Sequence, residues 1–150
     1  IGGMKSSVKM TQAVNLSITD AGTGLATYRL TVTRTHHGTG SWPDHENNNF
    51  TRIVVPATAT LTAATLDGEP ASPTLSEPAA SRTAFGFQID TLPGTTRTLV
   101  ATFRVPIDRT LAPTFSWQKQ PGVVSDKLTV HYNGRTLIDR DVDRDVSIEL

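Results

Sequence analysis

The chain has 150 residues, with 14 Lys plus Arg against 14 Asp plus Glu and 0 Cys. A formal net charge of +0 disfavours nucleic acid as a partner, because binding to phosphates needs an excess of cations, and it equally disfavours a polybasic membrane-surface module. The lack of cysteine excludes disulfides and thiolate zinc sites, and no apolar run approaches the roughly 18 residues of a membrane span, so this chain itself is not expected to insert into a membrane.

The N-terminal part of the chain predicts a long β-hairpin. Residues 1–7 carry no apolar targeting segment and are expected to be a linker or an expression remnant, followed by a single domain over residues 8–150. Apolar and polar residues alternate from Val8 onward, and the alternation resumes after a glycine-containing turn at residues 20–24. We therefore expect residues 8–35 to form two antiparallel strands.

The rest of the chain alternates between strand patterns and turn signals. A polar loop is expected over residues 36–49, and Asp67-Gly68 and Asn133-Gly134 are hairpin signals. Further strands are expected over residues 50–55, 58–66, 83–89, 95–105, 114–119, 128–132, 136–138 and 142–150. No segment has the 3.6-residue period of a helix. The sequence predicts an all-β fold, an immunoglobulin-like or jelly-roll-type antiparallel β-sandwich of about eight to ten strands, with closure into a barrel as the alternative.

Several blocks of sequence are similar to those of a known family. They are Trp42-Pro43, Phe50-Thr51-Arg52-Ile53-Val54-Val55-Pro56, Phe85-Gly86-Phe87, Leu92-Pro93-Gly94-Thr95, Phe103-Arg104-Val105-Pro106 and Trp117-Gln118-Lys119-Gln120-Pro121-Gly122. Together, over roughly residues 28–148, they resemble the C-terminal β region of bacterial membrane-anchored proteins of the domain-of-unknown-function 4012 family. The resemblance implies an extracytoplasmic, cell-surface module, tethered through a segment outside this chain, and it implies no catalytic residues.

The densest polar cluster lies in the expected loop and contains three histidines. His36, His37 and His45 stand near Asp44 and Glu46, and imidazole and carboxylate are suitable ligands for zinc or nickel. However, no regular element between these residues would fix a coordination geometry, and a solvated polar loop explains them equally well. We therefore predict no metal and no cofactor, and keep the three histidines as candidate binding residues.

A second polar series lies near the C-terminus and resembles a calcium-binding ladder. Its members are Asp139, Asp141, Asp143 and Asp145. An EF-hand-type loop needs Gly at its sixth position and Glu at its twelfth, where this chain has Arg144 and Leu150. We therefore interpret the series as a solvated strand or its turn.

The two tryptophans have different contexts. Trp117 alternates with Phe115 and is expected on the core face of a strand that ends in a Pro121-Gly122 turn. Trp42 lies in the polar loop, where an aromatic ring can stack on a sugar, anchor a partner or cap the sandwich.

Ser41 lies outside any nucleophile-elbow motif, and no pair of carboxylates stands out, so no catalytic residue is predicted.

Three functional hypotheses follow from these patterns. The first is a non-catalytic structural or interaction module of a bacterial cell-envelope protein, with protein domains or glycans of the envelope as partners. The alternative is a carbohydrate-binding module that uses Trp42, although aromatic residues make up only 6% of the chain. The third, a metal-dependent enzyme built on the histidine loop, is the least favoured.

Overall fold

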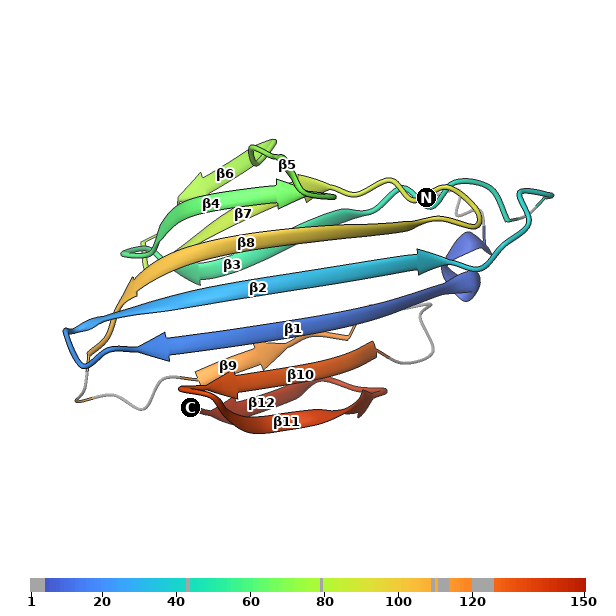
Figure 1. Ribbon diagram of the computed structural model, residues 1–150. Coiled ribbons are helices and arrows are strands. Elements are labelled where there is room, and N and C mark those ends of the chain that lie inside the picture. Colours follow the sequence, from blue (N-terminus) through green and yellow to red (C-terminus); the bar gives the residue numbers. More distant parts are fainter. Residues whose placement is uncertain (1–4, 43, 79, 109, 111–113, 120–125) are drawn as a thin grey trace.

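The computed structural model describes residues 5–42, 44–78, 80–108, 110, 114–119 and 126–150 (Figure 1). In this part of the chain a short 3-10 helix precedes twelve strands. The elements are η1 (Lys5–Lys9), β1 (Met10–Asp20), β2 (Leu25–His36), β3 (Phe50–Pro56), β4 (Thr60–Leu66), β5 (Glu69–Pro70), β6 (Leu75–Pro78), β7 (Arg82–Gln88), β8 (Thr96–Pro106), β9 (Thr114–Trp117), β10 (Asp126–Tyr132), β11 (Arg135–Val142) and β12 (Val146–Glu149). The all-β prediction is confirmed. Within the described residues, no helix has the length and apolarity needed to cross a membrane.

The strands are arranged in two layers. The front layer in Figure 1 is a seven-stranded sheet in the order β11-β10-β1-β2-β8-β4-β5, and two smaller sheets, β3-β7-β6 and β12-β9, lie behind it. Phe87 of β7 belongs to the core cluster, and Phe115 of β9 packs against that same cluster. One continuous core therefore joins the large sheet to both smaller sheets, as in a β-sandwich.

The strand directions differ in one respect from the antiparallel sandwich that the sequence predicts. β1 pairs with β2 in antiparallel fashion, but its other neighbour, β10, runs parallel to it, with residues 12–18 opposite residues 126–132. Alternation of apolar residues specifies which face of a strand is buried, but it does not specify the direction of a neighbour that is more than a hundred residues away in sequence. The large sheet is consequently mixed.

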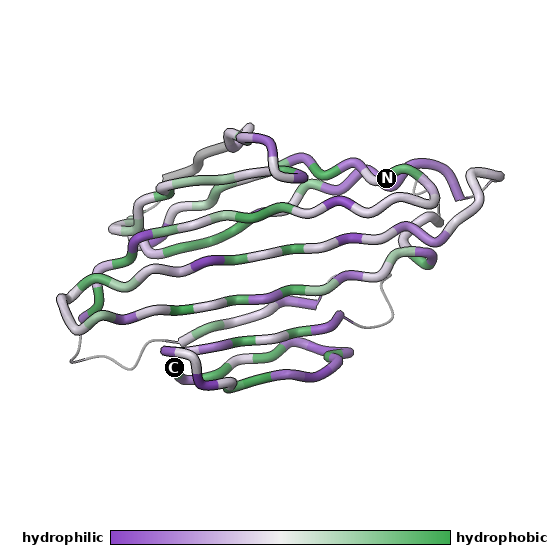
Figure 2. Tube along the Cα trace, in the orientation of Figure 1, coloured by the Kyte–Doolittle hydropathy of each residue, from purple (hydrophilic) through white to green (hydrophobic). Residues whose placement is uncertain are grey.

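Strand alternation explains how the core is formed. Met10, Gln12, Val14, Leu16 and Ile18 of β1 are buried, whereas the residues that alternate with them are exposed or partly exposed. Figure 2 shows the same change of hydropathy along the strands of the large sheet. The predicted hairpin over residues 8–35 is confirmed as β1 and β2, which pair from Met10 opposite His36 to Asp20 opposite Ala26.

Two predicted turns adopt the backbone that their residues favour. Asn133 has φ 48° and Gly134 has φ 80°, and Asp67 has φ 54° and Gly68 has φ 89°. Positive φ at both central residues is the signature of the type I′ turn, whose twist matches that of the strands it joins. These turns connect β10 to β11 and β4 to β5.

Residues on the inner face of the large sheet lie in rows across β10, β1, β2 and β8. One row is apolar and buried: Leu128, Val14, Val32 and Leu99. The next row, nearer the end of the sandwich that carries η1, is polar: Asp126, Gln12, Arg34 and Arg97. The inner face therefore changes from hydrocarbon to hydrogen-bonding groups at this end.

The N-terminal segment is more ordered than a linker. Residues 5–9, part of which was expected to precede the domain as a linker, form η1, and Ser6 within it is buried. Ser6 accepts a hydrogen bond from the amide of Asn47 at 3.1 Å. The composition of this N-terminal segment does not predict the contact, because the partner, Asn47, lies about forty residues away in sequence.

Candidate functional site

Three segments meet at one end of the sandwich, which we call the loop end: η1, residues 37–49, and the connection from β7 to β8 at residues 89–95 (Figure 1). The backbone N–H of His37 donates to the carbonyl of Lys9 at 2.9 Å, and the N–H of Gly94 donates to the carbonyl of His36 at 2.9 Å. These bonds join the long loop to the other two segments. All four candidate binding residues, Trp42 and the three histidines, lie at this end.

His36 is not available to a ligand. Its side chain is buried, Nδ1 accepts a hydrogen bond from the N–H of Gly38 at 2.9 Å, and Nε2 lies 2.8 Å from the carbonyl oxygen of His45. A carbonyl only accepts, so Nε2 is the donor in this contact, and Nδ1 is the acceptor in the other. His36, a candidate binding residue from the sequence, has both ring nitrogens engaged with the backbone of the loop.

The other two histidines are exposed but do not converge with His36. The Nε2 atom of His37 lies 2.8 Å from Oγ1 of Thr11 on β1, and His45 lies on the opposite stretch of the loop. Among the residues that the structure describes, no three His, Asp or Glu side chains are placed to hold a metal ion. The loop thus places the backbone of His45 next to the His36 ring, but it does not bring the three imidazole rings together at one point.

Trp42 lies in the loop between β2 and β3, and 82% of its surface is exposed. It therefore does not cap the sandwich. Pro43, which follows it, lies outside the described residues. Trp42 leaves a large apolar surface in water, which a partner or ligand could cover.

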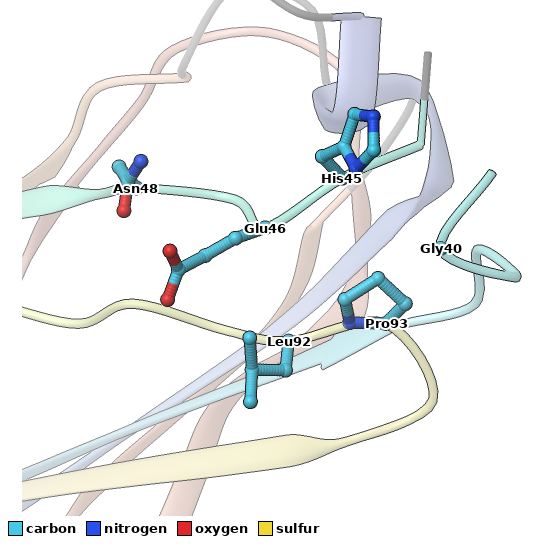
Figure 3. A pocket seen from close by; sticks show the side chains of 6 residues that line it. All are labelled: Gly40, His45, Glu46, Asn48, Leu92 and Pro93. Atoms are coloured by element: carbon cyan, nitrogen blue, oxygen red, sulfur yellow. The ribbon is translucent and has the colours of Figure 1, made fainter. Parts of the chain in front are cut away.

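An open hollow of about 500 Å³ lies between the loop and the β7–β8 connection (Figure 3). Its lining residues are Gly40, His45, Glu46, Asn48, Leu92 and Pro93. In Figure 3 the Glu46 side chain extends toward Leu92, whereas the ring of His45 points away from Glu46. The hollow therefore offers a carboxylate and an amide on one side and an apolar surface on the other.

Asn47 anchors this part of the loop to the interior of the sandwich. Its backbone exchanges two hydrogen bonds with Thr91, at 2.9 and 3.0 Å, and its side chain is buried. Oδ1 accepts from Nη2 of Arg34 at 2.9 Å. Because Asn47 points inward, its neighbours Glu46 and Asn48 are left exposed to solvent at the hollow.

Buried polar side chains on β2 and β1 connect Asn47 to Asp126 on β10. Nη1 of Arg34 donates to Oε1 of Gln12, and Nε2 of Gln12 donates to Oδ1 of Asp126 in a long hydrogen bond of 3.5 Å. Trp117 donates from Nε1 to Oδ2 of Asp126 at 3.2 Å. We call the connected side chains of Asp126, Gln12, Arg34 and Asn47 the polar relay.

The relay contains two ionisable groups that are almost completely shielded from water. The exposed fraction is 0% for Asp126 and 2% for Arg34. Burial raises the pKa of Asp126, against the opposing effects of Lys119, Trp117, Arg34 and Gln12, and burial lowers the pKa of Arg34 against the opposing effect of Asp126. Sequence reasoning missed the relay, although Gln12 and Arg34 occupy inward positions of otherwise apolar strands.

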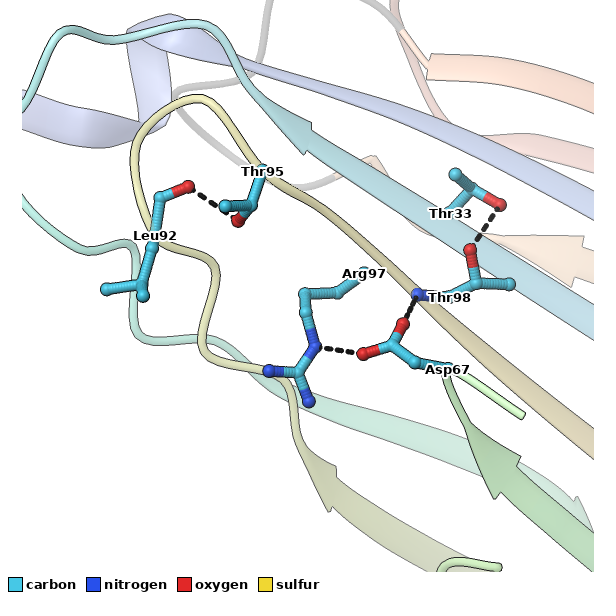
Figure 4. A network of polar contacts seen from close by, with 6 residues as sticks. All are labelled: Thr33, Asp67, Leu92, Thr95, Arg97 and Thr98. Atoms are coloured by element: carbon cyan, nitrogen blue, oxygen red, sulfur yellow. Dashed lines mark hydrogen bonds and ion pairs between the residues drawn. The ribbon is translucent and has the colours of Figure 1, made fainter. Parts of the chain in front are cut away.

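The polar row ends in a surface ion pair (Figure 4). Nε of Arg97 lies 2.5 Å from Oδ2 of Asp67 in the β4–β5 turn, and Oδ1 of Asp67 accepts from the N–H of Thr98 at 2.7 Å. The hydroxyl of Thr98 lies 3.5 Å from that of Thr33 on β2. Both charged side chains are about one-third exposed, at 35% and 39%, so this pair contributes little to stability.

Trp117 lies on the core side of β9, as predicted, but it is only partly buried. Pro121 and Gly122, which are expected to form the turn after this strand, lie outside the described residues. The indole both packs on the core and satisfies the buried Asp126 carboxylate. Trp117 is therefore an architectural residue with a polar contact that alternation alone does not predict.

The C-terminal aspartates engage separate partners. Asp139 pairs with Nζ of Lys127 at 2.7 Å, and Asp143 pairs with Nε of the adjacent Arg144 at 2.9 Å. Oδ1 of Asp145 accepts from the backbone N–H of Lys119 at 2.9 Å. The interpretation of this series as a solvated strand and turn agrees with these contacts.

The sequence matches no protein-family model and no curated protein. Among solved structures, an M1 zinc metallopeptidase mutant from Deinococcus radiodurans with bound substrate has 14% identity and a TM-score of 0.41, and it aligns over 87% of this chain and 35% of its own. Yeast LTA4 hydrolase has 10% identity and a TM-score of 0.46, over 83% of this chain and 23% of its own.

A nutrient binding protein described as putative, from Legionella pneumophila, has 10% identity and a TM-score of 0.49 over 83% of this chain and 51% of its own. This chain therefore spans about half or less of the length of these three proteins. At such identities and TM-scores the likeness carries no argument about activity.

Proposed function

We propose that this chain is a non-catalytic structural or interaction module of a bacterial cell-envelope protein, located outside the cytoplasm, and that it contacts its partner through the loop end. The observation that carries the proposal is Trp42, which is 82% exposed on a loop anchored by buried hydrogen bonds. An anchored loop loses little conformational entropy on binding, and a large aromatic ring supplies much of the binding energy at interfaces.

Two further features support this proposal. Leu92, on the neighbouring connection, is 55% exposed, so apolar surface is not confined to one side chain at this end. The resemblance of residues 28–148 to the C-terminal β region of membrane-anchored proteins of the domain-of-unknown-function 4012 family supports the cell-envelope setting. The expected partners are protein domains or glycans of the envelope.

The test is a pull-down of envelope extract on the immobilised chain, with Trp42→Ala as the variant. Leu25→Ala is the matched control, because Leu25 is an exposed apolar residue at the opposite end of β2. We expect Trp42→Ala to lose the captured partner and Leu25→Ala to retain it. Capture that is equal for both variants, or deletion of the domain from its parent without any change in envelope localisation, would contradict the proposal.

A carbohydrate-binding module is the second candidate, and the hollow between the loop and the β7–β8 connection favours it. Glu46 and Asn48 present a carboxylate and an amide, which can hydrogen-bond sugar hydroxyls, opposite the apolar surface of Leu92 and Pro93 (Figure 3). A volume of about 500 Å³ lies within the usual range of small-ligand sites. The sugar ring would contact the apolar side with its C–H face.

Binding to a glycan array and to peptidoglycan fragments distinguishes the two candidates. For a sugar site, Glu46→Gln should lower glycan binding at least about tenfold, because a lost charged hydrogen bond is worth about 1.5–3 kcal/mol. Trp42→Ala, which removes an aromatic stacking surface, should lower glycan binding as well. For a protein interface away from the hollow, Glu46→Gln should leave the pull-down unchanged. The absence of glycan binding by the unmodified chain would exclude the second candidate alone.

A further inference from the structure

We propose that the polar relay is a pH-responsive latch: it holds the described parts of the loop, residues 37–42 and 44–49, in place while the Asp126 carboxylate is charged, and it releases them when this carboxylate is protonated. The inference concerns movement of the loop and does not depend on what the loop binds. It rests on the placement of one buried cation between a buried carboxylate and the loop.

The relay connects β10 to the loop, and Arg34, in its middle, donates hydrogen bonds to both sides. Asp126 accepts from the Gln12 amide, which turns the Gln12 carbonyl oxygen toward Arg34. The Arg34 guanidinium then donates to Asn47, whose own amide donates to Ser6 in η1 at 3.1 Å. Asn47 is thus the point at which the loop is attached to the sheet interior.

The charged groups around the relay come from β2, β8 and the segment after β9; Arg97 of β8 lies opposite Arg34 and pairs with Asp67. Asp126 is faced by the cations of Arg34 on β2 and Lys119 after β9, and by the uncharged Trp117 and Gln12. Asp126 is also the carboxylate that acts on Arg34 through space. In addition, Nε of Arg34 is buried and has no hydrogen-bond partner among the described residues. Arg34 is therefore a poorly compensated cation even when Asp126 is charged.

Protonation of Asp126 removes the negative charge that compensates Arg34. A buried cation without a compensating charge is strongly destabilising, and hydration of the guanidinium relieves the cost. The cover that must move is the loop at Asn47, because its side chain lies on the guanidinium. The backbone of Asn47 pairs with Thr91, and the loop is also held at His45 by His36 and at Asn49 by Ile89. Acid therefore favours the released loop.

The direction in which pH shifts the loop depends on which element covers each of the two charged groups. Trp117 of β9 contacts Asp126, whereas the loop covers Arg34, so release of the loop hydrates the cation but leaves the carboxylate buried. In the released state Arg34 is hydrated, so its charge stabilises the Asp126 carboxylate less. The pKa of Asp126 is therefore higher than in the held state. By linkage, a lower pH shifts the population toward release.

The two tryptophans allow both ends of the relay to be observed in one experiment. The chain is prepared with 5-fluorotryptophan, and the two fluorine NMR signals are assigned with Trp42→Phe and Trp117→Phe. In a pH titration, the Trp117 signal reports protonation of Asp126, which its indole contacts, and the Trp42 signal reports the loop. We expect both signals to shift with the same midpoint.

Two variants decide whether the coupling passes through the relay. Asp126→Asn cannot titrate and keeps one acceptor oxygen, for either Gln12 or Trp117, so both shifts should disappear. Asn47→Ala cuts the relay at the loop, so the Trp117 signal should still titrate while the Trp42 signal becomes independent of that midpoint. The second variant keeps the test valid if the first fails to fold.

Two outcomes would overturn the proposal. A Trp42 signal that stays constant while the Trp117 signal titrates would show that the loop does not respond to Asp126. A Trp42 shift that persists in Asp126→Asn would assign the response to the loop's own groups, Asp44, His45 and Glu46, instead of the relay.

Discussion

At the scale of single residues, the loop end depends on close packing around His36. A Cβ at Gly38 would lie 2.5 Å from Cε1 of His36 and 2.9 Å from Cβ of Asp44. Gly38→Ala should therefore lower the free energy of unfolding by about 1–3 kcal/mol, because buried side chains must move to admit the methyl group. Chemical denaturation measures this loss, and the exposed neighbour in Thr39→Ala provides the control. Equal stability of the two variants would show that the loop yields easily.

Asp126 gives a second prediction at this scale, through the pH dependence of global unfolding. Burial raises its pKa in the folded protein above the unfolded value of 3.8, so the folded state binds the proton more tightly. Stability from this group is present at low pH and is lost as pH rises through the folded pKa. The unfolding free energy of Asp126→Asn minus that of the unmodified chain should therefore increase as the pH rises above 3.8 and through the raised pKa of the folded state.

Urea denaturation at several pH values measures that difference, in which the titrations of the exposed aspartates cancel. A difference that decreases with pH would mean that Lys119 and Arg34 outweigh burial at Asp126. This prediction and the latch concern different equilibria. Unfolding exposes Asp126 itself, whereas release of the loop exposes Arg34 and leaves Asp126 covered.

At the scale of elements, β9 is held to the large sheet by Trp117. Its indole packs against the core cluster and donates to Asp126. Trp117→Ala should destabilise the domain by about 3 kcal/mol, the sum of lost packing and an unsatisfied buried carboxylate. Thermal unfolding measures this loss. Trp42→Ala is the matched control, because Trp42 is exposed and its removal should leave the melting temperature unchanged.

The β10–β11 hairpin allows backbone conformation to be tested without any steric contact. Gly134 has φ +80°, and nothing lies within 4 Å of a Cβ built there. Gly134→Ala should cost about 1–2 kcal/mol from backbone strain alone, in contrast to Gly38→Ala, whose cost comes from packing. Denaturation measures the loss, and a neutral Gly134→Ala would mean that the turn changes type without cost.

At the scale of the whole molecule, the parallel pairing of β1 and β10 unites the two ends of the chain. Ser17 lies opposite His131 on the outer face, and a chain with 0 Cys is a clean background for cross-linking. The double variant Ser17→Cys, His131→Cys should form a disulfide on oxidation, since paired strands bring Cα atoms within bonding range.

The cross-link has a control on the same two strands. Ala13→Cys with His131→Cys separates the thiols by four residues along the strand, about 13 Å, and should not close. Mass spectrometry of the oxidised proteins distinguishes the pairs. Equal cross-linking of both pairs would contradict the register between β1 and β10.

The sequence by itself determined which residues face the core and where several turns fall. Period-two alternation is a local property of extended backbone, so it predicts the β1–β2 hairpin and the core face of Trp117. The Asn133-Gly134 turn follows from the intrinsic tolerance of its residues for positive φ. The expectation of Trp42 as a candidate binding residue likewise needed only its place in a polar loop.

Only the tertiary structure decided which distant residues meet. The parallel neighbour of β1, the burial of His36 and the relay from Asp126 through Gln12 and Arg34 to Asn47 join segments that lie far apart in the chain. A buried polar side chain is acceptable only where a partner satisfies it, and that partner is supplied by the fold and not by neighbours in sequence. For this reason the same alternation that predicts the core places Arg34 on the inward face of β2 but cannot identify the partners that make its burial possible.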